Sequence, residues 1–264
     1  MLFDRTFWEL VTAEDLFRVM AEEENRRFVQ RTLSTLTFDP VWTERIREQV
    51  ASGQIELRCL LSWLARELRP KTYLEVGVRR GFSMAMVAAR CKEVEIYGFD
   101  RWVRNYAGID NPGPEFVQSE MAKIGYSKTI QFIAGDSRRT LPAFFRRHDA
   151  PLWERIRLHR KFSSRPTAFD MITIDGDHSL LGAYQDLLDT MPQCAPGGVV
   201  VFDDIAPDLA RLDPEVLQAE RSKDPFGWRD LLGVWRAVQG TFRNFRYFEH
   251  VQYPPGVGLA VRLS

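Results

Sequence analysis

The stretch Glu75-Val-Gly77-Val-Arg-Arg-Gly81-Phe82-Ser83 decides the fold of this chain. It follows a short apolar run that begins at Thr72, and it precedes a helical segment that begins at Ser83. This order predicts a strand, a tight glycine turn and the start of a helix. Glycines in such a turn let the backbone approach a ligand closely, and the first N–H groups of a helix can bind an anionic group. Because the Glu75 carboxylate can take a positively charged amine, the turn suits an amino-acid-like zwitterion.

Strands and helices alternate after this turn. The expected strands are Thr72–Val76, Glu95–Asp100, Ile130–Asp136, Phe169–Asp175, Gly198–Asp203, Arg246–Val251 and Val257–Leu263. The alternation predicts a doubly wound parallel sheet with helices on both faces. Only residues 252–256 separate the last two strands, and so short a connection can only make an antiparallel hairpin. We therefore expect an α/β protein with a Rossmann-like seven-stranded sheet and a C-terminal antiparallel hairpin.

Residues 1–69 are expected to form an N-terminal helical cap, followed by the α/β domain over 70–264. A capping signal at Thr12-Ala-Glu-Asp15 predicts a helix that runs past Arg27. Two further helices are expected over 41–51 and 55–68. A stripe of leucines in the last of these predicts packing in the core.

Two insertions, 148–167 and 206–228, interrupt the α/β pattern. The first insertion is rich in basic and aromatic residues, a composition that is also found in nucleic-acid-binding segments. Because Lys+Arg and Asp+Glu are both 36, the whole chain has no net charge that would attract nucleic acid. We interpret the first insertion as a solvated helix or a lid.

The composition indicates an ordinary globular protein. Apolar residues make up 45% and charged residues 27% of the 264 residues, and no apolar run reaches the roughly 18 residues that a membrane span needs. The N-terminus lacks the apolar core of a signal peptide. The cysteines, Cys59, Cys91 and Cys194, are widely spaced in apolar surroundings and are interpreted as reduced thiols. We expect a cytoplasmic protein without a nucleic-acid or membrane partner, and a homo-oligomer is left open.

Each expected parallel strand ends in or beside an acid. These acids are Glu75, Asp100, Asp136, Asp175 and Asp203. The carboxyl ends of parallel strands share one rim, where ligands bind in doubly wound sheets. A single acid there commonly caps a helix or forms a turn. Five acids on one rim would repel each other unless a cation or a hydroxyl-rich ligand lies between them. Asp100, about 20 residues after the turn, suits the hydroxyls of a ribose.

The turn resembles the first motif of class I S-adenosylmethionine-dependent methyltransferases, and its Gly-x-x-x-Gly-aromatic-Ser form is closest to catechol-type O-methyltransferases. It departs from the fuller glycine pattern because Arg79 stands where the middle glycine would be. The resemblance implies that S-adenosylmethionine is the cofactor. It assigns these residues to the cofactor site: Glu75, Gly77, Gly81, Ser83, Asp100, Asp136, Ser137 and Asp175. Trp102 either packs on the adenine face or is a buried lid residue.

The second half of the rim is similar to metal-dependent O-methyltransferases of the catechol and macrolide-sugar types. Those enzymes place a metal-binding Asp at the end of the fourth strand and an acid pair at the end of the fifth, which here are Asp175, Asp203 and Asp204. Three hard oxygen donors suit Mg²⁺ or Mn²⁺. His178 stands where the macrolide-sugar type has a histidine, so it is the candidate catalytic base. The alternative is a histidine with a purely structural role.

The sequence therefore predicts a Mg²⁺-dependent O-methyltransferase that uses S-adenosylmethionine. Its acceptor would be a hydroxyl of a small molecule such as a sugar or a secondary metabolite, as in natural product biosynthesis. Two alternatives are a metal-independent N- or C-methyltransferase and a non-catalytic protein that binds S-adenosylmethionine. Metal titration in a methyl-transfer assay separates the three.

Overall fold

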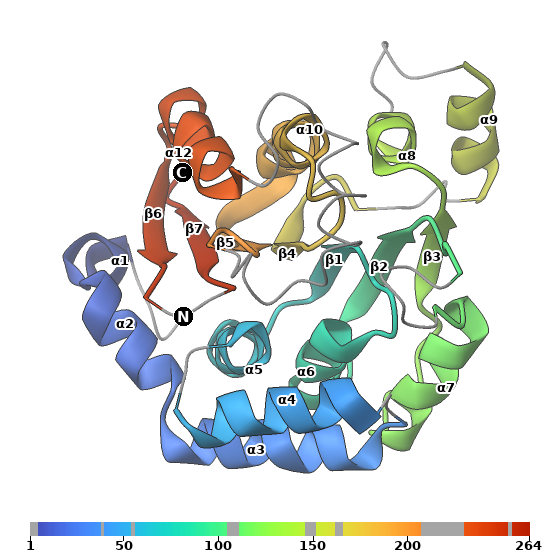
Figure 1. Cartoon of the computed structure of the whole chain (residues 1–264). Helices are drawn as coiled ribbons and strands as arrows, with labels where there is room; N and C mark the ends of the chain where they lie inside the picture. The colour runs from blue at the N-terminus through green and yellow to red at the C-terminus, as the bar shows by residue number, and fades with distance from the viewer. Residues whose placement is uncertain are drawn as a thin grey trace.

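A twisted sheet of seven strands runs through the centre of the molecule, with helices on both faces (Figure 1). This computed structural model describes residues 5–37, 40–53, 56–104, 111–145, 152–161, 166–206, 230–252 and 255–264. The strand order is β3-β2-β1-β4-β5-β7-β6, with β7 antiparallel to both of its neighbours. The strands are β1 Thr72–Val76, β2 Glu95–Asp100, β3 Gln131–Ala134, β4 Phe169–Ile174, β5 Cys194–Asp203, β6 Phe245–His250 and β7 Val257–Arg262. The predicted α/β sheet and its C-terminal hairpin are confirmed.

Two groups of helices cover the two faces of the sheet. One face carries α5 Leu57–Leu68, α6 Phe82–Arg90 and α7 Pro114–Lys123, and the other carries α8 Ser137–Phe144, α10 Leu180–Thr190 and α12 Leu231–Thr241 (Figure 1). A short 3-10 helix, η1 Met191–Gln193, follows α10. Strand β5 shows why both faces need cover. Its successive side chains point to opposite faces, and Val199 and Val201 join one apolar core while Val200 and Phe202 join the other.

The N-terminal helices are α1 Arg5–Leu10, α2 Ala13–Met20, α3 Glu23–Thr35 and α4 Pro40–Ala51. The Thr12 side chain accepts the Asp15 amide at 3.1 Å, which confirms the predicted cap. The helix that starts there does not run past Arg27, because the chain breaks after α2 and restarts as α3. Buried Asn25 explains the break, since its side-chain amide donates to the carbonyl oxygens of Met20 and Cys59, both at 2.8 Å. In a continuous helix, the Met20 carbonyl would accept a backbone amide instead.

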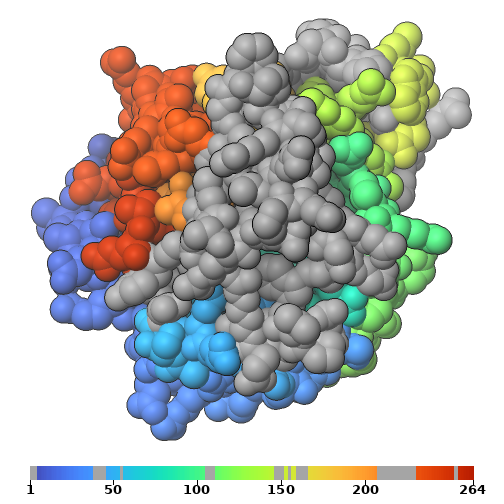
Figure 2. All heavy atoms as spheres, in the orientation of Figure 1, coloured from blue at the N-terminus to red at the C-terminus, as the bar shows by residue number. Residues whose placement is uncertain are grey.

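The N-terminal helices share an apolar core with the sheet. In α5, the leucines Leu57, Leu60, Leu61 and Leu64 are buried in the same cluster as Val87 and Val199, which confirms their predicted packing role. The rings of Trp8 and Phe248 lie 6.2 Å apart, so α1 packs on the C-terminal hairpin. Figure 2 shows the first helices next to the C-terminal elements along one edge of the molecule. A division at residues 69 and 70 remains a prediction.

The two predicted insertions lie partly outside the described residues. Within 148–167, the structure describes the helix α9 Leu152–Lys161, which buries Leu158 and exposes Leu152 and Trp153. Almost all of 206–228 lies outside the described residues, as does 105–110 in the loop after β2. Within the ranges that the structure describes, no helix combines the length and the apolar character needed to cross a membrane.

Candidate functional site

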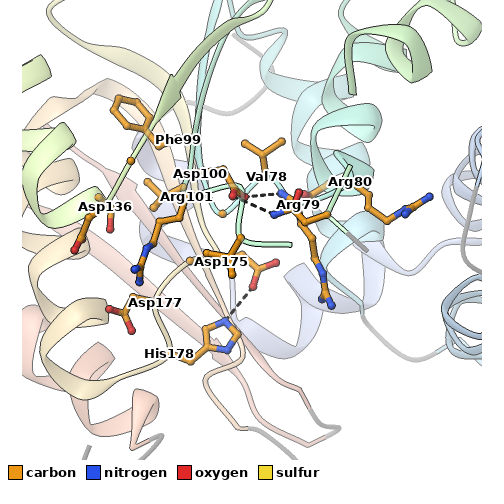
Figure 3. Close-up of a pocket in the computed structure, with 18 of the residues that line it drawn as sticks. Val78, Arg79, Arg80, Phe99, Asp100, Arg101, Asp136, Asp175, Asp177 and His178 are labelled. Carbon is orange, nitrogen blue, oxygen red and sulfur yellow. Dashed lines mark hydrogen bonds and ion pairs between the residues drawn. The ribbon is translucent and has the colours of Figure 1, made fainter. Parts of the chain in front are cut away.

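A cavity of about 420 Å³ opens at the carboxyl ends of β1, β2 and β4 (Figure 3). Of the predicted site residues, its wall includes Gly77, Ser83, Asp100, Asp136, Ser137, Asp175 and His178. Glu75, Gly81, Trp102, Asp203 and Asp204 are not part of this wall as the described residues form it. The single rim predicted from the strand ends therefore exists, although not every acid reaches the cavity.

The two glycines of the turn are required by close contacts within the protein. Gly77 has a left-handed φ of 89°, and a Cβ there would lie 1.9 Å from the carbonyl oxygen of Asp175. Gly81 has a φ of 77°, and a Cβ there would lie 2.7 Å from Cγ1 of Val117 on α7. A side chain at either position would disrupt the packing before it met any ligand. The turn is therefore tight because strand β4 and helix α7 approach it from two sides.

Glu75 lies behind the cavity wall. It is completely buried, and its carboxyl accepts hydrogen bonds from the Tyr73 hydroxyl at 2.7 Å and from the Ser83 hydroxyl at 2.5 Å. Burial raises the pKa of Glu75 to about 8, although the hydrogen bonds from Ser83 and Tyr73 oppose the shift. The structure does not bring this carboxyl to the cavity as a partner for an amine. Instead, Glu75 holds Ser83 at the start of α6.

Asp100 is fixed at the cavity edge by backbone donors. Its Oδ2 accepts the Arg79 amide at 2.7 Å, and its Oδ1 accepts the Trp102 amide at 2.6 Å and the Asn111 side-chain amide at 3.3 Å (Figure 3). Arg79, which stands at the missing glycine, has a left-handed φ of 52°. The hydrogen bond to Asp100 helps to offset the modest cost of that conformation for a residue with a Cβ. The Asp100 carboxylate is thus oriented before any ligand arrives.

The corner between β3 and α8 forms the next part of the wall. Asp136 caps α8 and accepts the Arg138 guanidinium at 2.9 and 3.1 Å. These hydrogen bonds are the main cause that lowers the pKa of Asp136. Trp102 packs edge-on against Phe132, with ring centroids 5.5 Å apart, and contributes to the apolar core. Of its two predicted roles, its position favours the packing role over the adenine face.

A second group of side chains gathers at the ends of β4 and β5. His178 Nε2 lies 3.3 Å from Oδ1 of Asp175, and His178 Nδ1 lies 3.4 Å from Oδ2 of Asp204. One ligand atom from each of the three residues lies within 4.8 Å of the others. Asp204 reaches this group with a left-handed φ of 59°. The imidazole of the predicted base is therefore flanked by two carboxylates.

Asp203 does not join this group, contrary to the predicted trio of carboxylates. It is buried on strand β5, on the side of Val199 and Val201, because neighbouring side chains of a strand point to opposite faces. Its Oδ1 makes no hydrogen bond among the described residues. Burial raises the pKa of Asp203 well above its usual range, and the charges of Asp175 and Asp204 add to the shift.

The donor set fits a hard divalent cation. Asp175 and Asp204 offer carboxylate oxygens beside the imidazole of His178, and such oxygens are suitable ligands for Mg²⁺ or Mn²⁺. Among the described residues, Oδ1 of neighbouring Asp203 accepts no hydrogen bond, and the half-buried acids Asp175 and Asp204 lie close enough for their charges to affect the Asp203 carboxyl. A cation at this end would relieve that repulsion. The residues present therefore fit the predicted Mg²⁺ or Mn²⁺.

Sequence reasoning missed several residues of the wall. They are Arg58, Arg101, Asn111, Asp177 and Arg138. Asp177 lies within the Asp175-Gly-Asp177-His178 motif, and its Oδ1 accepts the Ser179 amide at 2.9 Å before α10. Its place in that motif was the only signal available. Arg58 belongs to α5, before the sheet begins, and nothing in the order of the sequence points to the cavity.

Solved structures share this fold. An O-methyltransferase of tomaymycin synthesis from Streptomyces achromogenes, solved with S-adenosylmethionine, is 18% identical with a TM-score of 0.53, and the match covers 87% of this chain and 92% of that one. A methyltransferase from Podospora anserina, bound to S-adenosylhomocysteine, is 14% identical with a TM-score of 0.54, covering 90% and 88%. An O-methyltransferase from Bacillus cereus, also with S-adenosylhomocysteine, is 12% identical with a TM-score of 0.50, covering 91% of each chain.

The sequence itself identifies the family. No curated protein matches the chain. A family model described as a methyltransferase domain matches residues 74–205, which run from β1 to just beyond β5 and include the glycine turn, Asp100 and the group around His178. The predicted class of enzyme is confirmed, and the chain belongs to this family of methyltransferase domains.

Proposed function

We propose that this methyltransferase transfers a methyl group from S-adenosylmethionine to a hydroxyl of a small molecule with the help of Mg²⁺ or Mn²⁺. The group of Asp175, His178 and Asp204 carries the proposal. Asp175 and His178 of this group line a cavity that also presents oriented acids at Asp100 and Asp136. One cavity thus offers a place for a cofactor and a place for proton transfer.

The cofactor would be held by residues that are already in position. Asp100, fixed by two backbone amides, would accept hydrogen bonds from the ribose hydroxyls. Asp136 and Ser137 would lie beside the adenine, and Ser83 and Gly77 beside the methionine part. S-adenosylmethionine supplies an electrophilic methyl group on a sulfonium. The protein has to align the acceptor oxygen with it and accept the proton of the hydroxyl.

The chemistry would fall to the second group. Asp175 and Asp204 would hold the metal, with Asp203 behind them. When bound, the metal would act as a Lewis acid that makes the acceptor hydroxyl easier to deprotonate. His178 would accept that proton, and the two carboxylates at 3.3 and 3.4 Å would stabilise the imidazolium that forms.

A small acceptor is supported by the size of the cavity. About 420 Å³ lies in the range of small-molecule sites, and the cofactor takes part of it. The similarly folded Streptomyces achromogenes enzyme acts in tomaymycin synthesis. We propose a hydroxylated secondary metabolite or sugar as the acceptor, and a cytoplasmic location for the enzyme.

A methyl-transfer assay with a panel of hydroxylated acceptors tests this function. Transfer should stop after exhaustive chelation and return with Mg²⁺ or Mn²⁺. Full activity after chelation would support the metal-independent alternative instead. Binding of S-adenosylhomocysteine without transfer to any acceptor class would support the non-catalytic alternative.

A further inference from the structure

Arg58 lines the same cavity as Ser83 and Asp175. It is the second residue of α5, and only 16% of its side chain is exposed. Nη1 forms an ion pair with Glu56, whose carboxylate also accepts the Arg58 backbone amide at 2.8 Å. Nε is buried and makes no hydrogen bond among the described residues. Within the part of the chain that the structure describes, the Nε–H group of Arg58 therefore has no acceptor.

The surroundings keep Arg58 charged. Burial acts against the charge of the guanidinium, but the carboxylates of Glu56, Asp203 and Asp175 outweigh it and raise the pKa of Arg58. Arg58 also lies close enough to Glu75 for its charge to act on that carboxyl. These neighbours place the guanidinium between the end of β1 and the ends of β4 and β5. The ribose acid, Asp100, lies at the end of β2.

The amino-acid end of the cofactor needs a group of this kind. Its carboxylate has to leave water, and a buried carboxylate needs charged or hydrogen-bonding partners. The hydroxyl of Ser83 is already donated to Glu75, at 2.5 Å. A guanidinium presents its donors in a planar fork that matches a carboxylate. Arg58 is a cation on the same wall as Ser83, and its charge acts on Glu75, the hydrogen-bond partner of Ser83, whereas Arg138 pairs with Asp136 near the predicted adenine position.

We propose that Arg58 binds the α-carboxylate of the methionine part of S-adenosylmethionine. This role rests on the proposed function, because it assumes that the cofactor occupies the cavity with its adenosine toward Asp100. It assigns a residue of the N-terminal helices to cofactor recognition. The competing role is purely structural, with Arg58 serving only as the counter-ion of the buried carboxylates Glu56 and Asp203.

Calorimetry with two ligands separates these roles. S-adenosylhomocysteine carries the carboxylate, whereas 5′-methylthioadenosine has the same adenosine and thioether but no amino-acid tail. Arg58→Ala should weaken the binding of S-adenosylhomocysteine by about 10- to 100-fold, the usual loss for hydrogen bonds between charged groups. The affinity for 5′-methylthioadenosine should not change. Equal weakening of both ligands, or no change in either, would overturn the role of Arg58.

Two further variants keep the test decisive. Arg58→Ala leaves the Glu56 carboxylate buried without its partner, so the double variant Glu56→Gln/Arg58→Ala removes that charge and should show the same selective loss. Arg138→Ala is the matched control, because it alters the adenosine end of the same cavity and should change both affinities by the same factor. If the parent protein binds neither ligand, the proposed function itself fails, and that result is distinct from a loss of selectivity in the Arg58 variants.

Discussion

The acids at the two ends of the rim formed by the strand ends differ in the groups that surround them. At the β2–β3 end, Asp100 accepts two backbone amides and Asp136 accepts the Arg138 guanidinium. At the β4–β5 end, Asp175 and Asp204 flank the imidazole of His178, and a buried oxygen of Asp203 accepts no hydrogen bond from any residue that the structure describes. The same residue type thus stands in two electrostatic settings on one rim.

This difference indicates that the two groups of acids have different roles, one in cofactor recognition and the other in chemistry. Acids that are fixed by protein donors orient a ligand at little further cost, which suits the recognition of a cofactor. Acids that are crowded together raise each other's pKa and bind a cation or a proton when one is available. We therefore expect substitutions of His178 and Asp204 to affect chemistry, and substitutions of Asp100 and Asp136 to affect cofactor affinity.

His178→Ala should give the largest effect. A general base contributes about 10²–10⁴-fold, so the single-turnover rate with an accepted hydroxyl substrate should fall on that scale. Affinity for S-adenosylhomocysteine should not change, because the proposed cofactor contacts do not include His178. The rate of the parent enzyme should rise with pH as the imidazole loses its proton.

A melting curve serves as the control for His178→Ala. If the histidine only joins two strand ends, the variant should lose stability while its folded fraction turns over normally. Normal single-turnover chemistry would remove His178 from the mechanism and would leave the β4–β5 end without its base.

Asp100→Asn should give a smaller loss, confined to binding. The amide keeps the shape but removes the charge and one acceptor, so S-adenosylhomocysteine should bind about tenfold more weakly, as expected for a hydrogen bond to a charged group. Turnover at saturating cofactor should stay close to that of the parent. A large fall in turnover at saturation, with unchanged affinity, would mean that the two ends do not divide the work in this way.

Asp186→Asn should change only the pH dependence of stability. Burial raises the pKa of Asp186 from 3.8 to about 8, and Asp177 and Asp189 add to the shift. The folded protein keeps this proton while the unfolded chain loses it. The contribution of protonated Asp186 to the free energy of unfolding is therefore complete below about pH 4. It is lost as the pH rises to about 8, by at most about 1.4 kcal/mol per pH unit.

Urea unfolding at pH 5 and pH 8 measures this loss. The free energy of unfolding should fall less between the two values in Asp186→Asn than in the parent. The exposed acid Glu95 offers a control, because Glu95→Gln should leave the difference unchanged. Parallel falls in the parent and in Asp186→Asn would show that Asp186 is ionised in the folded protein.

The sheet could be predicted because its signals are local. The strand, turn and helix at 72–90 and the short link before β7 each fit within a few residues, and together they determine the direction of the strands. The break after α2 could not be predicted in this way. It depends on Asn25 reaching the carbonyl of Cys59, which is 34 residues away in the sequence.

The site was predicted in part for the same reason. Asp100 ends β2, and Asp175 and His178 follow β4, so the topology brings them to one rim. The position of Glu75 depends on Tyr73 and Ser83, which enclose its carboxyl, and that of Asp203 depends on which face of β5 it occupies. Arg58 reaches the cavity only because α5 packs on the sheet, which is a contact between distant parts of the chain.

The central claim is that the acids at the ends of β4 and β5 bind a cation, whereas Asp100 and Asp136 bind the cofactor. Titration of Mn²⁺ into the parent protein and into Asp204→Asn, followed by calorimetry, tests this claim most directly. S-adenosylhomocysteine is titrated into both proteins in parallel. We predict that the parent binds Mn²⁺, and that the loss of one charged ligand weakens this binding by at least about tenfold. The affinity for S-adenosylhomocysteine should be the same in both. Equal Mn²⁺ binding by the two proteins, or a parallel loss of S-adenosylhomocysteine affinity, would contradict the account.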